Sequence, residues 1–349
     1  MGFQIKGQLL SADRPPFIIA ELSANHGGSL ERAKSIIKLA KQSGADAVKI
    51  QSYEPHTITL DSNEKDFLIE DGLWKGQSLY TLYSDAFTPF KWHQELFEYA
   101  KEEDIILFSS PFDETAVDLL EELDTPAYKI ASFELCDLAL ITKVAKTHKP
   151  ILMSTGLSNM HEIEQAVMTA RENGAHELLL FHCISSYPAE AKDSCLHNIS
   201  ILREKFDLLV GLSDHTIDNT ASIVATTLGA CAIEKHFTDS RLNGGVDSTF
   251  SIEPKELEEL KRVTSDAWLS IKHKEFRRPQ CEEANIKFKR SIYFCEDLKV
   301  GQRIKSSSIR VVRPGYGLEP KYFEKILGSR LVKPASHGQR VTWEHFADS

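Results

Sequence analysis

The 349-residue chain lacks the hallmarks of membrane, secreted and nucleic-acid-binding proteins. It has no uninterrupted run of about 18 apolar residues, and no basic start followed by an apolar stretch, so no membrane span and no secretory signal are expected. The formal net charge of −10 argues against nucleic acid or an anionic membrane as a partner, because both select a basic face. No glycine-rich nucleotide loop of either common kind occurs, which argues against ATP or NAD.

Cysteine is sparse, and the six cysteines form neither a Cys-x-x-Cys pair nor a regular disulfide framework. A reducing, cytoplasmic compartment is therefore expected. Hydrophobic residues make up 42% of the chain and charged residues 26%, which is typical of a globular protein with a sizeable core.

Short apolar runs alternate with helix-period segments eight times. The runs are 17–20, 45–50, 105–108, 127–130, 151–153, 178–181, 208–211 and 230–233. Continuous apolar runs are typical of parallel strands buried on both faces. The segment 29–43 has an apolar stripe, with Ser29 as a possible N-cap and Gly44 to end the helix. Eight such units predict an α/β fold, a (β/α)8 TIM barrel.

The predicted domains are a barrel over 1–274, a charged linker over 275–289 and a small β-rich domain over 290–349. Short β-like pieces at 291–294 and 309–312 and a turn at 314–317 indicate the last domain. A long, aromatic-rich stretch, 53–90, follows the second strand. Such a connection is more often functional than accidental, and a surface subdomain packed on itself is an equal alternative.

Polar or ionisable residues follow every predicted strand. They are Glu21; Lys49 and Gln51; Ser109 and Ser110; Lys129 and Ser132; Ser154 and Thr155; His182 and Ser185; Ser213, Asp214 and His215; and Glu234, Lys235 and His236. Barrel active sites form at the carboxyl ends of the strands, so an inward-facing subset is expected to meet at one mouth. Core packing alone would not produce this pattern, because buried polar groups without partners are costly.

Two histidines follow neighbouring strands. His215 and His236 could form an open divalent-metal site together with water, and a pair of hydrogen-bonded histidines is the alternative. His182 lies inside an apolar run, which is more typical of a core histidine.

Two lysines could bind a phosphorylated anion. Lys49 and Lys129 supply charge, and serine hydroxyls would complete the oxygen contacts. Ordinary ion pairing with Glu21 or Glu134 is the alternative. Lys235 is a weaker candidate, because neighbours on a strand point to opposite sides and His236 is expected to face the mouth.

Six motifs in this order resemble those of the sialic acid (nonulosonic acid) synthase family. They are 19–28 (IAELSANHGG), 48–51 (VKIQ), 128–132 (YKIAS), 154–156 (STG), 211–215 (GLSDH) and 233–237 (IEKHF). The tail around Arg313-Pro314-Gly315 is similar to the family's antifreeze-like (SAF) domain. Within the family, 21–26 (ELSANH), 72–74 (GLW), 108–112 (FSSPF) and 247–251 (DSTFS) most resemble the pseudaminic acid synthases. Synthases of N-acetylneuraminate and legionaminate usually carry a glycine after the glutamate of the opening motif, and an asparagine where this chain has Ser185.

The resemblance implies a transferase that condenses phosphoenolpyruvate with 2,4-diacetamido-2,4,6-trideoxy-L-altrose, giving pseudaminic acid and phosphate by C–O cleavage. The phosphoenolpyruvate ligands it implies are Lys49, Ser109, Ser110, Lys129, Ser132, Ser154, Ser185 and Ser213. The sugar ligands it implies are Glu21, Gln51, Trp74, Tyr187, Asp247 and Arg313. The catalytic residues it implies are Glu21, Glu134 and His236.

The resemblance also implies a cofactor and an oligomer. His215 and His236 would hold Mn²⁺, Co²⁺ or Mg²⁺. The protein would form a homodimer in which the SAF domain caps the partner's barrel and brings Arg313 to its substrate. The acceptor lacks a 6-hydroxyl, so the aromatic stretch 53–90, with Trp74, would supply an apolar wall.

Other functions remain open from sequence. A Schiff-base aldolase would use Lys49, Lys129 or Lys235 as its nucleophile, and borohydride trapping with an α-keto acid separates it from the synthase. A non-catalytic carbohydrate-binding protein would bind sugar without releasing phosphate. A synthase of N-acetylneuraminate or legionaminate would keep the chemistry and change the sugar.

Overall fold

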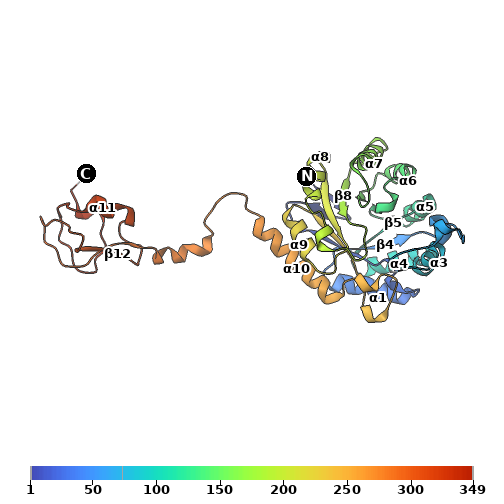
Figure 1. The fold of residues 1–349 in the computed structure, drawn as a ribbon, viewed down its shortest axis with the longest axis horizontal. Coiled ribbons are helices and arrows are strands. Elements are labelled where there is room, and N and C mark those ends of the chain that lie inside the picture. Colours follow the sequence, from blue (N-terminus) through green and yellow to red (C-terminus); the bar gives the residue numbers. More distant parts are fainter. Residues whose placement is uncertain (1, 73, 348–349) are drawn as a thin grey trace. The chain divides into compact units, whose positions relative to one another are not determined.

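The computed structural model describes residues 2–72 and 74–347, and the chain divides into two compact units between Lys272 and His273. The first unit contains eight parallel strands closed into a barrel, with helices around it (Figure 1). The strands are β3 (Phe17–Glu21), β4 (Ala47–Ser52), β5 (Ile106–Pro111), β6 (Tyr128–Ile130), β7 (Ile151–Ser154), β8 (Leu178–Cys183), β9 (Leu209–Asp214) and β10 (Ala232–His236). They follow chain order around the barrel, and β10 closes it against β3. The predicted (β/α)8 barrel is confirmed.

Helices surround the strands of this unit, and the first of them shows how the local sequence sets a helix's ends. They are α1 (Leu30–Gln42), α2 (Pro55–Ile58), α3 (Leu79–Ala86), α4 (Phe90–Glu102), α5 (Glu114–Glu122), α6 (Leu138–Ala145), α7 (Met160–Glu172), α8 (Asn198–Phe206), α9 (Thr220–Thr227) and α10 (Pro254–Ile271). The Ser29 side chain accepts a hydrogen bond from the Arg32 backbone N–H, which confirms the predicted N-cap of α1. Gly44 follows that helix with φ +89°, a conformation that glycine adopts freely.

Several strands extend two or three residues beyond the predicted apolar runs, because the backbone ladder continues into polar residues. Gln51 still pairs with Ser110, and Lys235 with Asp214. The polar residues are therefore part of the strands, and the two-residue period of a strand decides which of them face inward.

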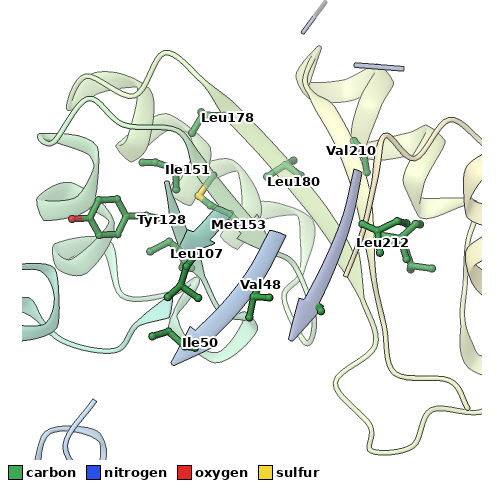
Figure 2. Packing of buried hydrophobic residues seen from close by; sticks show 14 of the residues in the cluster. Val48, Ile50, Leu107, Tyr128, Ile151, Met153, Leu178, Leu180, Val210 and Leu212 are labelled. Atoms are coloured by element: carbon green, nitrogen blue, oxygen red, sulfur yellow. The ribbon is translucent and has the colours of Figure 1, made fainter. Parts of the chain in front are cut away.

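Side chains on each strand alternate between the helix layer and the barrel interior. Figure 2 shows Val48, Ile50, Leu107, Tyr128 and other apolar residues of the layer between strands and helices. Their neighbours on the same strands face inward. This alternation places Lys49, Gln51, Ser110, Lys129, Ser154, Ser213, Glu234 and His236 on the inward side.

An N-terminal hairpin of β1 (Gly2–Ile5) and β2 (Gln8–Ser11) packs on the barrel interior at the amino ends of the strands. Phe3, Ile5 and Leu10 join one apolar cluster with residues such as Phe17 and Ala232. The hairpin was not predicted from the sequence. It covers the end of the barrel opposite the mouth.

The stretch 53–90 folds against the barrel through its aromatic residues. It contains α2, the 3-10 turn η2 (Lys65–Phe67) and α3. The Tyr53 ring meets those of Tyr83 and Phe112 edge to face, at 5.9 and 5.1 Å between centroids. Leu73 of the 72–74 motif lies outside the described residues.

The second unit has its own small core. β11 (Ser291–Phe294) pairs antiparallel with β12 (Ile309–Val312), and α11 (Phe323–Ile326) follows. Ile292, Phe294 and Ile309 belong to one buried cluster. The β-like pieces predicted at 291–294 and 309–312 are confirmed. Within residues 2–72 and 74–347, no helix combines the length and apolar character needed to cross a bilayer.

Candidate active site

Two lysines and two glutamates pair inside the carboxyl end of the barrel. Nζ of Lys49 lies 2.7 Å from Oε2 of Glu21 and 3.5 Å from Oε1 of Glu234. Nζ of Lys129 lies 2.7 Å from Oε2 of Glu234 and 4.5 Å from the ring centre of Phe181. All four charged side chains are buried. Each lysine therefore has a nearby carboxylate that compensates its charge.

The surroundings shift the protonation of these groups in different directions. Burial raises the pKa of Glu21 and lowers the pKa of Lys129. Burial works against Lys49, but Glu21 and Glu234 outweigh it and raise the pKa of Lys49. Burial also works against ionised Glu234, but Lys129 and Lys49 lower its pKa. Lys49 is therefore a cation and Glu234 an anion at neutral pH.

A cradle of hydroxyl groups surrounds Gly156, after β7. A Cβ atom at Gly156 would lie 2.4 Å from Oγ of Ser185 and 2.7 Å from Oγ of Ser132. The Gly156 backbone N–H also donates to the Ser132 hydroxyl at 3.2 Å. The missing side chain lets both hydroxyl groups lie close against the Gly156 backbone, where they converge as possible donors to an anion.

Three other predicted phosphate ligands are placed differently from one another. The Ser110 hydroxyl accepts from Nζ of Lys49 at 3.3 Å, and the Ser213 hydroxyl lies 3.4 Å from Oε1 of Glu234. Ser109 points to the helix layer, where its hydroxyl bonds Ser52 at 2.6 Å and the Ile50 carbonyl at 3.0 Å. The structure therefore brings Ser110 and Ser213 to the lysines and leaves Ser109 outside, because neighbours on a strand face opposite sides.

Two further residues at the strand ends serve as structural supports. Nζ of Lys235 donates to Asp214 Oδ2 at 2.9 Å and to the Thr216 and Asp218 carbonyls at 2.6 and 2.9 Å. His182 is buried, and its Nε2 bonds the Ser194 carbonyl at 2.7 Å. The predictions that Lys235 points away from the mouth and that His182 is a satisfied core residue are both confirmed.

Glu134 lies in the 3-10 turn η3 (Ser132–Glu134), next to the serine cradle in sequence. Burial raises the pKa of Glu134 to about 7. Its Oε2 is buried and has no hydrogen-bond partner within the described chain. A carboxyl group with a pKa near 7 and one unpaired oxygen can take up or release a proton at neutral pH.

The rings of His215 and His236 lie 5.4 Å apart, centroid to centroid. Nδ1 of His215 bonds the Ile184 carbonyl at 2.9 Å, so Nδ1 carries the proton and Nε2 keeps a lone pair. Nδ1 of His236 is buried, 3.8 Å from Oδ2 of Asp247, and has no hydrogen-bond partner among the residues that the structure describes. A carboxylate beside the second nitrogen of a histidine is a common arrangement behind metal ligands.

A histidine must be neutral at the nitrogen that binds a metal, and the two rings differ in how readily they take up a proton. Burial lowers the pKa of His236 well below its usual value, so this ring is neutral. Burial also lowers the pKa of His215, but the Cys183 thiol and the Ile184 carbonyl outweigh it and raise this pKa, so protons compete with a metal there. Within the described residues, no group of three or more His, Cys, Asp or Glu side chains is arranged to hold a metal. Two imidazoles can supply two metal ligands, and water or substrate oxygens would have to complete the site.

Aromatic rings line the mouth beside the histidines. The Tyr187 ring lies 4.3 Å from that of His215, 5.3 Å from Phe250 and 6.5 Å from Trp74. Trp74 also borders a cavity of about 440 Å³ lined by Gln77, Leu82, Asp85, Gly245, Val246 and Thr249. The stretch 53–90 thus meets the β10–α10 loop next to the histidines.

A polar network joins the remaining predicted sugar ligands. Nε2 of Gln51 donates to Oε1 of Glu21 at 3.0 Å and to the Ser23 hydroxyl at 3.1 Å. Ser23 donates to Oδ2 of Asp247 at 2.5 Å. Arg313 is exposed and belongs to the second unit, so its predicted contact with a sugar stays a prediction.

Comparison with known proteins identifies the family of the chain. The NeuB family model matches residues 36–276, and the SAF domain model matches residues 289–347. The chain belongs to the NeuB family.

The chain is also similar to curated relatives. It is 41% identical to the pseudaminic acid synthase of Helicobacter pylori over 92% of this chain and 94% of the relative. It is 33% identical to the N,N'-diacetyllegionaminic acid synthase of Legionella pneumophila over 94% of each chain. The crystal structure of the N-acetylneuraminic acid synthetase of Leptospira borgpetersenii, in complex with citrate, matches with a TM-score of 0.73 and 29% identity. That match covers 82% of this chain and 96% of the other. The recognition from sequence motifs, including the C-terminal SAF domain, is confirmed.

Sequence reasoning missed three residues of this NeuB-family site. Glu234 was noted at its strand end but not assigned, although it shares the inward side of β10 with His236. Gly156 was noticed only as part of a motif. Ser23 was likewise noticed only as part of a motif, because a single serine outside the strands carries no periodicity.

Proposed function

We propose that this NeuB-family protein is a pseudaminic acid synthase that condenses phosphoenolpyruvate with 2,4-diacetamido-2,4,6-trideoxy-L-altrose. The observation that carries the reaction class is the meeting of Lys49, Lys129 and the Gly156 cradle beside His215 and His236. The choice of sugar is supported by the higher identity to the pseudaminic acid synthase, 41%, than to the legionaminic acid synthase, 33%.

Phosphoenolpyruvate would lie against the two lysines and the hydroxyl groups. The hydroxyl groups of Ser132 and Ser185 offer donors to phosphate oxygens. Lys49 and Lys129 add positive charge that the glutamates now compensate, so the incoming anion competes with Glu21 and Glu234 for the ammonium groups. The raised pKa of Glu21 eases this exchange, because that carboxyl group accepts a proton more readily than usual.

The sugar aldehyde would bind between the histidines and the Gln51–Ser23–Asp247 network. A divalent metal on His215 and His236, Mn²⁺, Co²⁺ or Mg²⁺, would supply Lewis-acid polarisation of the aldehyde carbonyl. Asp247 and Gln51 would hold hydroxyl or amide groups, and Tyr187 would cover a face of the sugar. The binding energy of these contacts would orient the carbonyl carbon toward C3 of phosphoenolpyruvate.

The reaction would form a C–C bond and a C–O bond to water, and would break the C–O bond to phosphate. One proton of the water would end on the former aldehyde oxygen, which becomes a hydroxyl group, and the other would leave with phosphate. C3 of phosphoenolpyruvate attacks the aldehyde carbon, and water adds at C2, which carries the developing positive charge. Glu134 would take the proton from that water, since its pKa of about 7 suits a general base. Phosphate then leaves with the bridging oxygen, and C2 becomes the keto group of the product.

An apolar wall for the 6-deoxy end of the acceptor would come from the stretch 53–90. Trp74 supports this proposal, because its ring lies 6.5 Å from that of Tyr187 and borders the cavity next to the β10–α10 loop. Arg313 would contact the sugar from the SAF domain of a partner chain in a homodimer, where its planar fork suits carboxylate and acetamido oxygens.

A Schiff-base aldolase is supported by a single observation, the lowered pKa of Lys129. Lys235 is taken up by three hydrogen bonds, and the pKa of Lys49 is raised. Borohydride trapping with an α-keto acid tests this alternative. A Lys129 adduct would favour the aldolase, and no adduct is expected for the synthase.

Phosphate release from phosphoenolpyruvate with a panel of amino-sugar acceptors, with and without EDTA and Mn²⁺, tests the proposal. Metal-dependent release only with the diacetamido-trideoxy-altrose acceptor is expected. Release with N-acetylmannosamine instead would keep the reaction and overturn the sugar. Binding of sugar without release under any condition would favour a carbohydrate-binding protein.

A further inference from the structure

One hydroxyl group joins two loops of the barrel mouth. Oγ of Ser23, in the loop after β3, donates to Oδ2 of Asp247 at 2.5 Å and accepts from Nε2 of Gln51 at 3.1 Å. Asp247 lies in the loop between β10 and α10. Ser23 is 5% exposed and Asp247 is 7% exposed, so water does not readily replace either contact.

The backbone of Ser23 is in a conformation that disfavours a side chain. Its φ is +45°, in the left-handed region that glycine occupies without penalty. Asp207 has a similar φ of +50°, but it is the exposed C-cap of α8, where this conformation is common. A strained serine at a buried polar site indicates that its side chain has a role there.

The hydrogen-bond directions around Ser23 follow from the groups present. An ionised Asp247 only accepts, so Ser23 gives its single O–H proton to that carboxylate. The Ser23 oxygen can then only accept a second hydrogen bond, and Oε1 of Glu21 also accepts one. The Gln51 side chain must therefore turn its NH₂ group toward both atoms. Oε1 of Gln51 is then left to accept from a ligand hydroxyl or N–H.

The network connects the two halves of the site. Glu21 contacts Lys49 at one end, 2.7 Å away, and Asp247 lies 3.8 Å from Nδ1 of His236 at the other. Without the Ser23 hydroxyl, Asp247 Oδ2 would keep one long contact, 3.5 Å to the Ala24 N–H, and Gln51 would lose one acceptor.

We infer that Ser23 is a positioning residue that orients Asp247 and Gln51 for the sugar acceptor. This inference rests on the proposed function, in which those two residues bind the sugar. In the proposed binding mode Ser23 acts through Asp247 and Gln51 and does not itself bind either substrate. Its loss should therefore weaken sugar use and leave phosphoenolpyruvate binding intact.

The test compares Ser23→Ala, which keeps the strained Cβ, with Ser23→Gly, which removes both the hydroxyl and the strain. Both variants should lower kcat/KM for the sugar on the order of 10- to 100-fold, because a hydrogen bond to a charged group is lost. KM for phosphoenolpyruvate should not change. Ser23→Gly should melt at a higher temperature than Ser23→Ala, because both variants lose the same hydrogen bonds and only glycine relieves the backbone strain.

Asp207→Gly is the matched control, because it relieves a similar φ far from the mouth and should leave kcat/KM at the wild-type value. Unchanged sugar kinetics in both Ser23 variants would overturn the inference, and so would a parallel loss for sugar and phosphoenolpyruvate together with a lower Tm.

Crystal structures of wild type and Ser23→Gly give a readout that does not depend on activity. Rotation of the Asp247 and Gln51 side chains is expected, and unchanged positions would refute the inference. Failure of the proposed function would instead appear in the wild type alone, as no phosphate release with any acceptor.

Discussion

Glu234 and Lys129 form an ion pair across the full width of the barrel. Oε2 of Glu234 lies 2.7 Å from Nζ of Lys129, although β10 and β6 are four strands apart in the closed ring of eight. Both side chains are buried, and Glu234 also lies 3.5 Å from Nζ of Lys49. One carboxylate therefore holds two lysines in the interior until an anionic substrate competes for them.

Removing this carboxylate should destabilise the barrel. Glu234→Ala leaves the buried ammonium group of Lys129 without its carboxylate and Lys49 with Glu21 alone, and a broken buried ion pair typically costs about 3–5 kcal/mol in the free energy of unfolding. Urea denaturation of the first unit measures the loss. Asp266→Ala is the control, because Asp266 pairs with Arg262 on the exposed face of α10 and its removal should have no measurable effect. Equal stability of wild type and Glu234→Ala would contradict the role assigned to the pair.

Filling the cradle at Gly156 should weaken phosphoenolpyruvate binding. In Gly156→Ala the new Cβ would lie 2.4 Å from Oγ of Ser185 and 2.7 Å from Oγ of Ser132, so both hydroxyls must move. A rise in KM for phosphoenolpyruvate of roughly tenfold or more is expected from the strain of overfilling. Leu157→Ala, at the exposed neighbouring residue, should keep the wild-type KM. A normal KM in Gly156→Ala would show that phosphate binds elsewhere.

The sequence predicted the order of the strands and most of the residues that the structure brings together at the mouth. Each barrel strand can be recognised in the sequence as an apolar run followed by polar residues. It did not separate Ser109 from Ser110. Which of two neighbouring serines faces inward depends on the strand register, and the apolar run ends before it reveals that register. The N-terminal hairpin was missed because its strands have only four residues each, and their burial comes from contacts with residues far along the chain. The hydrogen bonds of Ser23 were equally hidden, since Asp247 is 224 positions away.

Metal removal should abolish phosphate release. EDTA treatment followed by Mn²⁺ addition should remove and restore activity in the wild type, because two imidazoles with open positions would form a removable site. His215→Ala and His236→Ala should lose Mn²⁺ binding, measured by calorimetry. His161→Ala, at an exposed position in the first turn of α7, should bind Mn²⁺ like the wild type. Full activity in EDTA would argue against the predicted metal.

The apolar wall predicts a selective effect on the sugar. Trp74→Ala should raise KM for the diacetamido-trideoxy sugar roughly tenfold, which corresponds to losing one aromatic contact. Trp74→Phe keeps a ring next to Tyr187 and should retain most of the affinity. KM for phosphoenolpyruvate should stay the same in both variants. An unchanged sugar KM in Trp74→Ala would remove this residue from the pocket.

The pH dependence of the reaction should follow Glu134. Burial raises the pKa of this carboxyl group to about 7, and a general base must be deprotonated to accept the proton of the attacking water. kcat/KM should therefore fall with decreasing pH below about 7 and level off above it. If the carboxyl group instead had to donate a proton, kcat/KM would fall with increasing pH above about 7, so the direction of the pH dependence distinguishes a general base from a general acid. Glu134→Gln preserves the shape of the side chain, and it should lower the rate by about 10²–10⁴-fold and remove this acidic limb. If the limb persists in Glu134→Gln with its midpoint unchanged, another group titrates and Glu134 is not the base.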